Sequence, residues 1–212
     1  MKTIIFGGSF DPVHLGHLHL ANNLANQAEK IIFVPCFQNP LLDKGPQASS
    51  EDRLNMLKLA TKDNPKFIIS DFELTRKEKS YTINTLRFFS QNEKEKIGLI
   101  LGVDTFLTFK EWKEPEEVLK LSELIIYNRP GIEQTQIQNF LKDKLFEKAN
   151  IIFIAQSSLS ISSTQIKIYS FLKEDISPFT TPEVASYIKE KKIYQLNDNL
   201  EVINDHLNIK EK

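Results

Sequence analysis

Two histidines, His14 and His17, stand three positions apart near the start of the chain. They follow a short apolar segment that runs into a glycine pair, Gly7 and Gly8, where we expect a sharp turn that lets a ligand approach the backbone. A helical periodicity begins at about residue 16. Positions i and i+3 share one face of a helix, so both imidazoles can face one ligand. A helix N-terminus adds backbone N–H groups and a positive partial charge. We therefore expect that ligand to be a phosphate.

The histidine pair has two other interpretations. Zinc usually needs a third protein ligand, and Asp11 is the only residue nearby that could serve; the other alternative is a pair that merely caps and packs. The segment that carries the glycines and histidines is neither a phosphate-binding loop of the GxxxxGK[ST] kind nor a dinucleotide-binding turn with the GxGxxG spacing. With Cys36 as the only cysteine, neither an intramolecular disulfide nor a thiolate cluster can form, and we expect Cys36 to be a small, partly apolar loop residue. We predict no metal ion bound directly by protein ligands.

A second candidate anion site lies far along the chain. Its hydroxyls, on Ser162, Ser163 and Thr164, gather at a predicted helix start, and Lys167 follows one turn later. Serine and threonine are also ordinary N-cap residues, so the cluster alone leaves both interpretations open. Combined with the histidine pair, it favours a second set of phosphate contacts.

Two further residues, Asp104 and Trp112, have more than one interpretation. Asp104 follows a buried strand and Gly102, where its carboxylate could accept hydrogen bonds from ribose hydroxyls or cap a helix. Trp112 is the only tryptophan, and a core position is the default for it. Spacing alone decides neither case.

Apolar strands alternate with amphipathic helices along the chain. Strands are expected at 2–6, 30–35, 67–70, 96–101, 124–127 and 151–154. Helices are expected from about 16, from Ser50 as its cap, at 81–90, 106–109, 115–121, 133–147, 162–172 and 182–191, with a long loop at 36–49. This order predicts an α/β fold with one doubly wound, mostly parallel sheet and helices on both faces. In such sheets ligands bind at the carboxyl ends of the strands, where the winding reverses.

Length and composition limit the alternatives. The 212 residues suffice for one domain, which we place at 1–196, followed by a polar tail at 197–212 that we expect to be loosely ordered. The net charge of −1 provides no general field for a nucleic acid. No apolar run reaches membrane-spanning length and no signal peptide is evident, so we expect a cytoplasmic protein with neither nucleic-acid nor membrane partners. A homo-oligomer stays open.

The segment 8–17, Gly-Ser-Phe-Asp-Pro-Val-His-Leu-Gly-His, resembles the (T/S)-F-D-P-x-H-x-G-H signature of the nucleotidyltransferase superfamily. Within it, the chain resembles the bacterial nicotinate-nucleotide adenylyltransferases from residue 1 to about 195. Four further stretches carry this likeness: 51–57, 80–86, Gly102-x-Asp104 with Trp112, and 161–166. The resemblance implies a Rossmann-like fold and transfer of an adenylyl group from ATP to nicotinate mononucleotide, giving deamido-NAD and pyrophosphate in NAD biosynthesis.

The resemblance also implies roles for residues. His14 and His17 would be catalytic, with Mg²⁺ accompanying ATP. The ATP site would comprise Gly7, Gly8, Ser9, Phe10, His14, His17, Gly102, Asp104, Ser162, Ser163, Thr164 and Lys167. The acceptor site would comprise Lys44, Tyr81, Thr82 and Trp112.

Two positions depart from the family pattern. Lys167 stands where the family has arginine, which keeps the charge and loses the planar fork. Residues 39–44, Asn-Pro-Leu-Leu-Asp-Lys, lack the histidine of the family's Pro-His-Lys stretch. The alternatives are a sister enzyme that uses nicotinamide mononucleotide or phosphopantetheine, and a non-catalytic nucleotide sensor.

Overall fold

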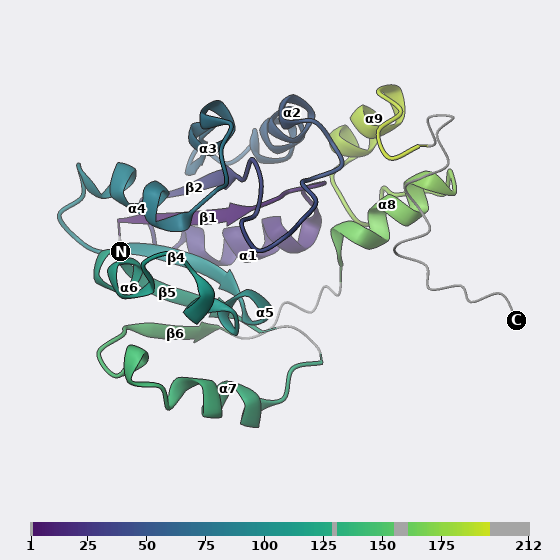
Figure 1. Ribbon diagram of the computed structural model, residues 1–212. Helices are drawn as coiled ribbons and strands as arrows, with labels where there is room; N and C mark the ends of the chain where they lie inside the picture. Colours follow the sequence, from purple (N-terminus) through teal and green to yellow (C-terminus); the bar gives the residue numbers. More distant parts are fainter. Residues whose placement is uncertain (1, 129–130, 155–160, 196–212) are drawn as a thin grey trace, which may run out of the picture.

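Six parallel strands form one sheet in the computed structural model, which describes residues 2–128, 131–154 and 161–195 (Figure 1). The strands are β1 (Thr3–Gly8), β2 (Lys30–Pro35), β3 (Phe67–Ile69), β4 (Ile97–Gly102), β5 (Ser122–Tyr127) and β6 (Ile151–Ile154). Their order is β3-β2-β1-β4-β5-β6, so the winding direction reverses between β1 and β4. The doubly wound sheet expected from the sequence is confirmed, and its switch point lies beside the histidine segment.

Helices follow the strands in the expected alternation. They are α1 (Leu15–Ala25), α2 (Ser50–Thr61), α3 (Phe72–Arg76), α4 (Thr82–Ser90), α5 (Val103–Phe106), α6 (Pro115–Leu121), α7 (Gln134–Leu141), α8 (Ser163–Phe171) and α9 (Pro182–Glu190), with 3-10 turns η1 (Phe109–Glu111) and η2 (Lys144–Phe146). The sequence did not predict α3. The helix expected at 106–109 is two short pieces, α5 and η1.

The helix expected at 133–147 is also wrong in its extent. It ends at Leu141, and η2 follows separately. The Asp143 side chain accepts a hydrogen bond from the backbone N–H of Leu145 at 3.0 Å. Aspartate offers the backbone this local alternative to the helical hydrogen bond, which ends the regular helix.

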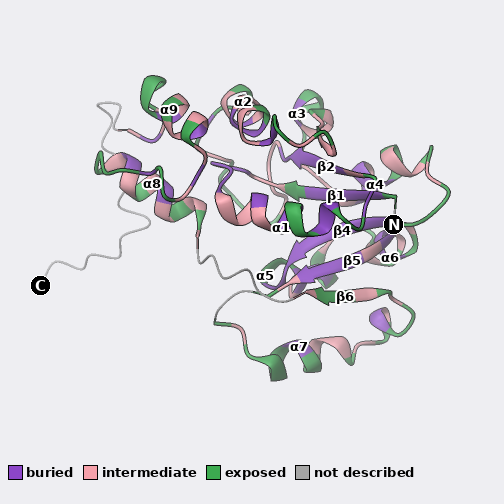
Figure 2. Cartoon of the chain, turned by 180° about the vertical axis from the view of Figure 1, so that it is seen from behind, coloured by how far each residue is buried: buried purple, intermediate pink, exposed green. Residues whose placement is uncertain are grey.

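Successive strand residues point alternately into two separate hydrophobic cores, one on each face of the sheet. In β1, Ile4 and Phe6 join the core formed with α1, α2, α8 and α9, whereas Ile5 joins the core formed with α4, α6 and α7. The central strands are accordingly buried along most of their length (Figure 2). In Figure 1, α8 and α9 lie on the side of the molecule to which the strand arrows point.

The α2 helix differs in detail from the prediction. Its N-cap is Ser49, not Ser50, and the Ser49 hydroxyl accepts the backbone N–H of Asp52 at 3.0 Å. Met56 and Leu57 are fully buried. Leu54 is only partly buried, because Arg53 occupies the inward position one turn before Met56 and is itself 1% exposed.

Within the described part of the chain, every helix is too short or too polar to cross a membrane. The expected tail at 197–212 lies outside the described residues.

Candidate active site

The segment between β1 and α1 makes a tight reversal at the carboxyl edge of the sheet. The glycine pair, predicted to form this turn, instead completes β1, where Gly7 and Gly8 pair with Val34 and Pro35. The reversal comes at Phe10, whose backbone is left-handed with φ of 46°. Gly7 is exposed, and a Cβ built there would meet nothing within 4 Å. The strand end therefore leaves room for a ligand to approach the backbone.

His14 and His17 face each other across the first turn of α1, as their spacing predicted. Their ring centroids lie 3.6 Å apart at an interplanar angle of 25°. His14 is the N-cap and is 5% exposed, while His17 is partly buried. The Nδ1 atom of His17 accepts the backbone N–H of His14, and the Nδ1 atom of His14 accepts the backbone N–H of His17, both at 3.3 Å.

This reciprocal capping fixes the chemistry of both rings. A nitrogen that accepts a hydrogen bond cannot carry a proton, so Nε2 is the protonated nitrogen of each neutral imidazole. Each histidine therefore presents an Nε2–H donor while its Nδ1 terminates the helix. The structure confirms that the two histidines cap the start of α1; a contact with phosphate stays a prediction.

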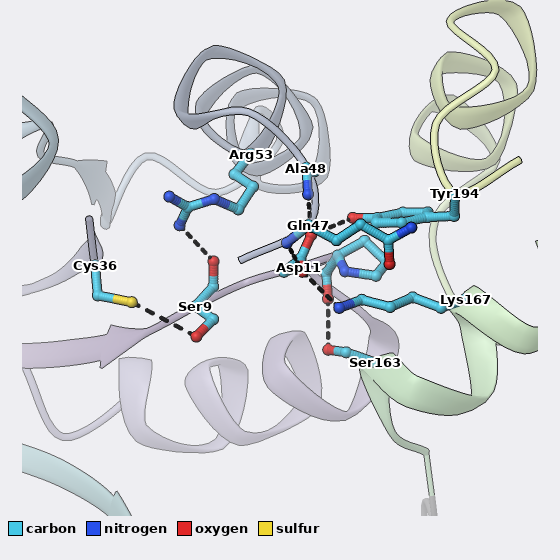
Figure 3. Close-up of polar contacts among 10 residues, drawn as sticks. Ser9, Asp11, Cys36, Gln47, Ala48, Arg53, Ser163, Lys167 and Tyr194 are labelled. Carbon is cyan, nitrogen blue, oxygen red and sulfur yellow. Dashed lines mark hydrogen bonds and ion pairs between the residues drawn. The ribbon is translucent and has the colours of Figure 1, made fainter. Parts of the chain in front are cut away.

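Asp11 joins the turn to three other segments of the chain (Figure 3). It is 3% exposed. Its carboxylate accepts hydrogen bonds from the backbone of Gln47 at 2.8 Å, the backbone of Ala48 at 3.0 Å, Nζ of Lys167 at 2.5 Å and the Tyr194 hydroxyl at 2.7 Å. Burial acts to raise the pKa of the Asp11 carboxyl, but the charge of Lys167 and these hydrogen bonds hold it below its ordinary value.

The start of α8 packs directly against the turn. The Ser163 hydroxyl donates to the carbonyl of Pro12 at 2.9 Å, and the Ser162 side chain caps α8 by accepting the N–H of Gln165 at 3.2 Å. Thr164 is exposed. The structure thus brings the second predicted anion site beside the first, with Ser162 serving as the ordinary N-cap. Lys167, expected at a phosphate, is paired with Asp11.

Arg53 is a buried cation next to the turn, and the sequence patterns did not lead us to assign it a role. Nη1 of Arg53 donates to the carbonyl of Ser9 at 2.7 Å, and Nε of Arg53 has no hydrogen-bond partner among the described residues. The Sγ atom of Cys36 lies 3.5 Å from the Ser9 hydroxyl (Figure 3). Burial raises the pKa of the Cys36 thiol, which keeps it protonated and unreactive. Arg53 therefore helps to hold the backbone of the signature segment 8–17 in place at Ser9.

Asp104 lies on the other side of the switch point. It is exposed and is the second residue of α5, and the N-cap of that helix is Gly102. The capping alternative for Asp104 is therefore excluded. A Cβ on Gly102 would come 2.4 Å from Oδ1 of Asp104 and 3.1 Å from the Tyr127 hydroxyl. The absence of a side chain at Gly102 thus lets the Asp104 carboxylate fold back over the end of β4.

Two of the segments that carry predicted acceptor residues lie close together. Tyr81 is the N-cap of α4, and Nζ of Lys113, next to Trp112 in the chain, lies 4.9 Å from the centroid of the Tyr81 ring. Trp112 packs on Phe109 at 5.0 Å between ring centroids and remains partly exposed. It is therefore only partly a core tryptophan. Thr82, the first residue of α4, is also partly exposed.

The long loop after β2 is tied at both ends. The N–H of Phe37 donates to the Ser80 hydroxyl at 2.9 Å, and the N–H of Ser80 donates to the carbonyl of Gln38 at 2.8 Å. At its other end the loop is bound to Asp11. Lys44 lies exposed between these anchors, so its assignment to the acceptor phosphate stays a prediction.

The comparisons with known proteins agree with this geometry. The cytidylyltransferase-like family matches residues 5–168, and the chain belongs to that family. An Aquifex aeolicus protein named probable nicotinate-nucleotide adenylyltransferase is 44% identical, over 76% of this chain and 99% of its own. A Caldicellulosiruptor saccharolyticus protein of the same name is 37% identical, over 92% and 100%.

Solved structures match the fold. Plasmodium falciparum nicotinic acid mononucleotide adenylyltransferase complexed with NaAD superposes with a TM-score of 0.74 at 23% identity, covering 92% of this chain and 98% of that one. A putative nicotinate-nucleotide adenylyltransferase from Vibrio parahaemolyticus superposes with a TM-score of 0.63 at 21% identity, covering 92% and 96%. The Rossmann-like architecture expected from the resemblance is confirmed.

Proposed function

We propose that this chain is a nicotinate-nucleotide adenylyltransferase, which joins the adenylyl group of ATP to nicotinate mononucleotide and releases pyrophosphate. The observation that carries the proposal is the pair of Nε2–H donors on His14 and His17, held by reciprocal capping beside the switch point of the sheet. The 44% identity to a relative of that name supports the choice of reaction. The cytoplasmic location expected for such an enzyme stays a prediction.

The reaction needs no side-chain nucleophile. A phosphate oxygen of the mononucleotide attacks the α-phosphorus of ATP, the bond from that phosphorus to the bridging oxygen breaks, and pyrophosphate leaves with the electron pair. Negative charge accumulates on the α-phosphate and on the leaving group. Catalysis therefore depends on alignment and on hydrogen-bond donors placed at that charge.

We assign His14 and His17 as the hydrogen-bond donors to the phosphate oxygens on which this charge accumulates. Their tautomers are set before ATP binds, so the donors need no reorganisation during the reaction. His17 is assigned to the α-phosphate. The first turn of α8, with Ser163, Thr164 and Lys167, is assigned to the outgoing pyrophosphate.

The remaining residues hold the two substrates. The carboxylate of Asp104 would accept hydrogen bonds from the ribose of ATP, and Trp112 and Tyr81 would hold the pyridine ring. The partial exposure of Trp112 supports this stacking role.

Mg²⁺ would enter with ATP. Among the described residues, no cluster of three or more histidines, cysteines or carboxylates could hold a metal ion. The ion would be carried by the phosphates of ATP, where it would neutralise their charge.

The test is a product assay with the purified chain, Mg-ATP and an equimolar mixture of nicotinate mononucleotide, nicotinamide mononucleotide and phosphopantetheine. We expect deamido-NAD as the main product, with one pyrophosphate for each dinucleotide. A main product formed from either other acceptor would assign the chain to a sister enzyme. ATP binding without pyrophosphate release would favour the nucleotide sensor.

A further inference from the structure

Lys167 and Asp11 form an ion pair whose two members are unequally exposed. The Lys167 side chain is 28% exposed and the Asp11 side chain 4%. The lysine can turn towards another anion while staying partly hydrated, whereas the carboxylate cannot leave its buried position. A buried carboxylate that loses its cation is strongly destabilising unless other donors remain.

Three neutral donors do remain on Asp11. Two are the backbone N–H groups of Gln47 and Ala48. The third is the Tyr194 hydroxyl, which donates to Oδ1 at 2.7 Å, whereas Lys167 binds Oδ2. If Lys167 turned away, only Oδ2 of Asp11 would lose a hydrogen bond, and Oδ2 would still accept the backbone N–H of Gln47.

Tyr194 contacts both members of the pair. It is 5% exposed, and Nζ of Lys167 lies 5.6 Å from the centroid of its ring. Burial and the adjacent Asp11 carboxylate raise the pKa of the Tyr194 phenol, so its hydroxyl stays a donor at neutral pH. The residue lies beyond α9, far from the motif in sequence, and has no part in the chemistry proposed above.

We propose that Tyr194 is a positioning residue for the ATP site, whose hydroxyl holds the Asp11 carboxylate in place when Lys167 turns from Asp11 to the phosphates of ATP. The inference rests on the proposed function, because it requires Lys167 to reach ATP. It also explains why a buried tyrosine at the end of the described chain is hydrogen-bonded to Asp11, which lies in the segment between β1 and α1, here called the phosphate turn. Without its hydroxyl, Asp11 would retain Lys167 more strongly, and ATP would compete less well for the amine.

Tyr187 provides a matched control. Its hydroxyl also donates to an aspartate, Oδ1 of Asp52 at 2.9 Å, and it lies in α9, seven positions before Tyr194. Asp52 belongs to α2 and not to the phosphate turn. Both Tyr→Phe changes remove one hydroxyl–carboxylate hydrogen bond, but only one removes it from Asp11.

The experiment measures the Kd of Mg-ATP by calorimetry, with initial-rate kinetics in parallel, for Tyr194→Phe, Tyr187→Phe, Lys167→Met and Lys167→Met with Tyr194→Phe. We expect Tyr194→Phe to raise the Kd and KM of ATP roughly 3- to 10-fold, while kcat and the KM of the acceptor change less than about twofold. Tyr187→Phe should leave all of them unchanged. In the Lys167→Met background, Tyr194→Phe should have no further effect on ATP.

Two results would overturn the inference: an unchanged Kd for ATP in Tyr194→Phe, or the same increase with and without Lys167. Thermal melting of all four variants ensures that folded protein is compared. The Kd measurement needs no acceptor. If the wild-type chain bound ATP but made no deamido-NAD, the proposed function would fail while the coupling between Tyr194 and Lys167 would still be measured.

Discussion

A Cβ atom on Gly16 would lie 3.0 Å from Nδ1 and 3.1 Å from Cε1 of His14. The contact is tighter than ordinary van der Waals packing, so any larger residue at this position would force the His14 ring to shift by a few tenths of an ångström. Gly16 lies in the first turn of α1, so its function is to leave space for His14.

Gly16→Ala separates this steric role from stability. Alanine favours a helix over glycine by about 1 kcal/mol, which offsets the roughly 1 kcal/mol lost if the His14 cap is disturbed, so the Tm should change little. We expect kcat to fall at least about tenfold, because the His14 ring is displaced from its donor position. Steady-state kinetics and thermal melting of the same preparation check this. Wild-type kcat would show that the ring position does not matter.

Gly102→Ala should weaken ATP binding, also by displacing a neighbouring side chain. The added methyl group would collide with the Asp104 carboxylate and the Tyr127 hydroxyl, both of which can swing aside, so the cost to stability should be small. Displacing Asp104 should raise the KM for ATP about fivefold or more, through loss of a charge-assisted hydrogen bond to the ribose. An ATP analogue that lacks both ribose hydroxyls is the control substrate, because it cannot make this hydrogen bond. An equal rise in KM for that analogue would refute the role of Asp104.

Trp112→Leu tests the acceptor site. Leucine keeps an apolar contact with Phe109 and removes the aromatic face. We expect the KM of nicotinate mononucleotide to rise about tenfold with an unchanged KM for ATP, since aromatic stacking contributes roughly 1–3 kcal/mol per ring. An equal effect on both substrates would point to a general packing defect. Phe109→Leu, at a fully buried position, serves as the control for such a defect.

Asp11 makes stability depend on pH. Its pKa is lowered from 3.8 in the folded protein, so its contribution is complete above 3.8 and is lost as the pH falls through the folded value. Urea unfolding from about pH 6 to about pH 3 should therefore show a weaker acid dependence in Asp11→Asn than in wild type. Asp143→Asn is the control: hydrogen bonding to Lys110 also lowers the pKa of Asp143, but that carboxylate is solvated. Equal slopes in the two variants would contradict the prediction.

Local features were predictable from the sequence. His14 and His17 share a helix turn, so their spacing alone indicated a common face. The strand and helix alternation likewise specified the sheet. Two of the backbone predictions that were wrong, the glycine turn and the long helix after residue 133, depend on single residues, Phe10 and Asp143.

Distant contacts were not predictable. Tyr194 and Asp11 are 183 positions apart, and no local periodicity links them. Arg53, by contrast, carries a signal in its position: it precedes Met56 and Leu57 by three and four residues, which places it on the buried face of α2. A charged residue on such a face needs a polar partner, here the carbonyl of Ser9.

The central claim is that the imidazole of His17 stabilises charge on the α-phosphate. It is tested most directly by kcat for deamido-NAD formation in His17→Ala, beside His19→Ala in the same helix and with melting curves for both. The predicted result is a kcat about 100-fold or more below wild type for His17→Ala, with near wild-type turnover for His19→Ala and both proteins folded. A folded His17→Ala protein with near wild-type turnover would contradict the claim.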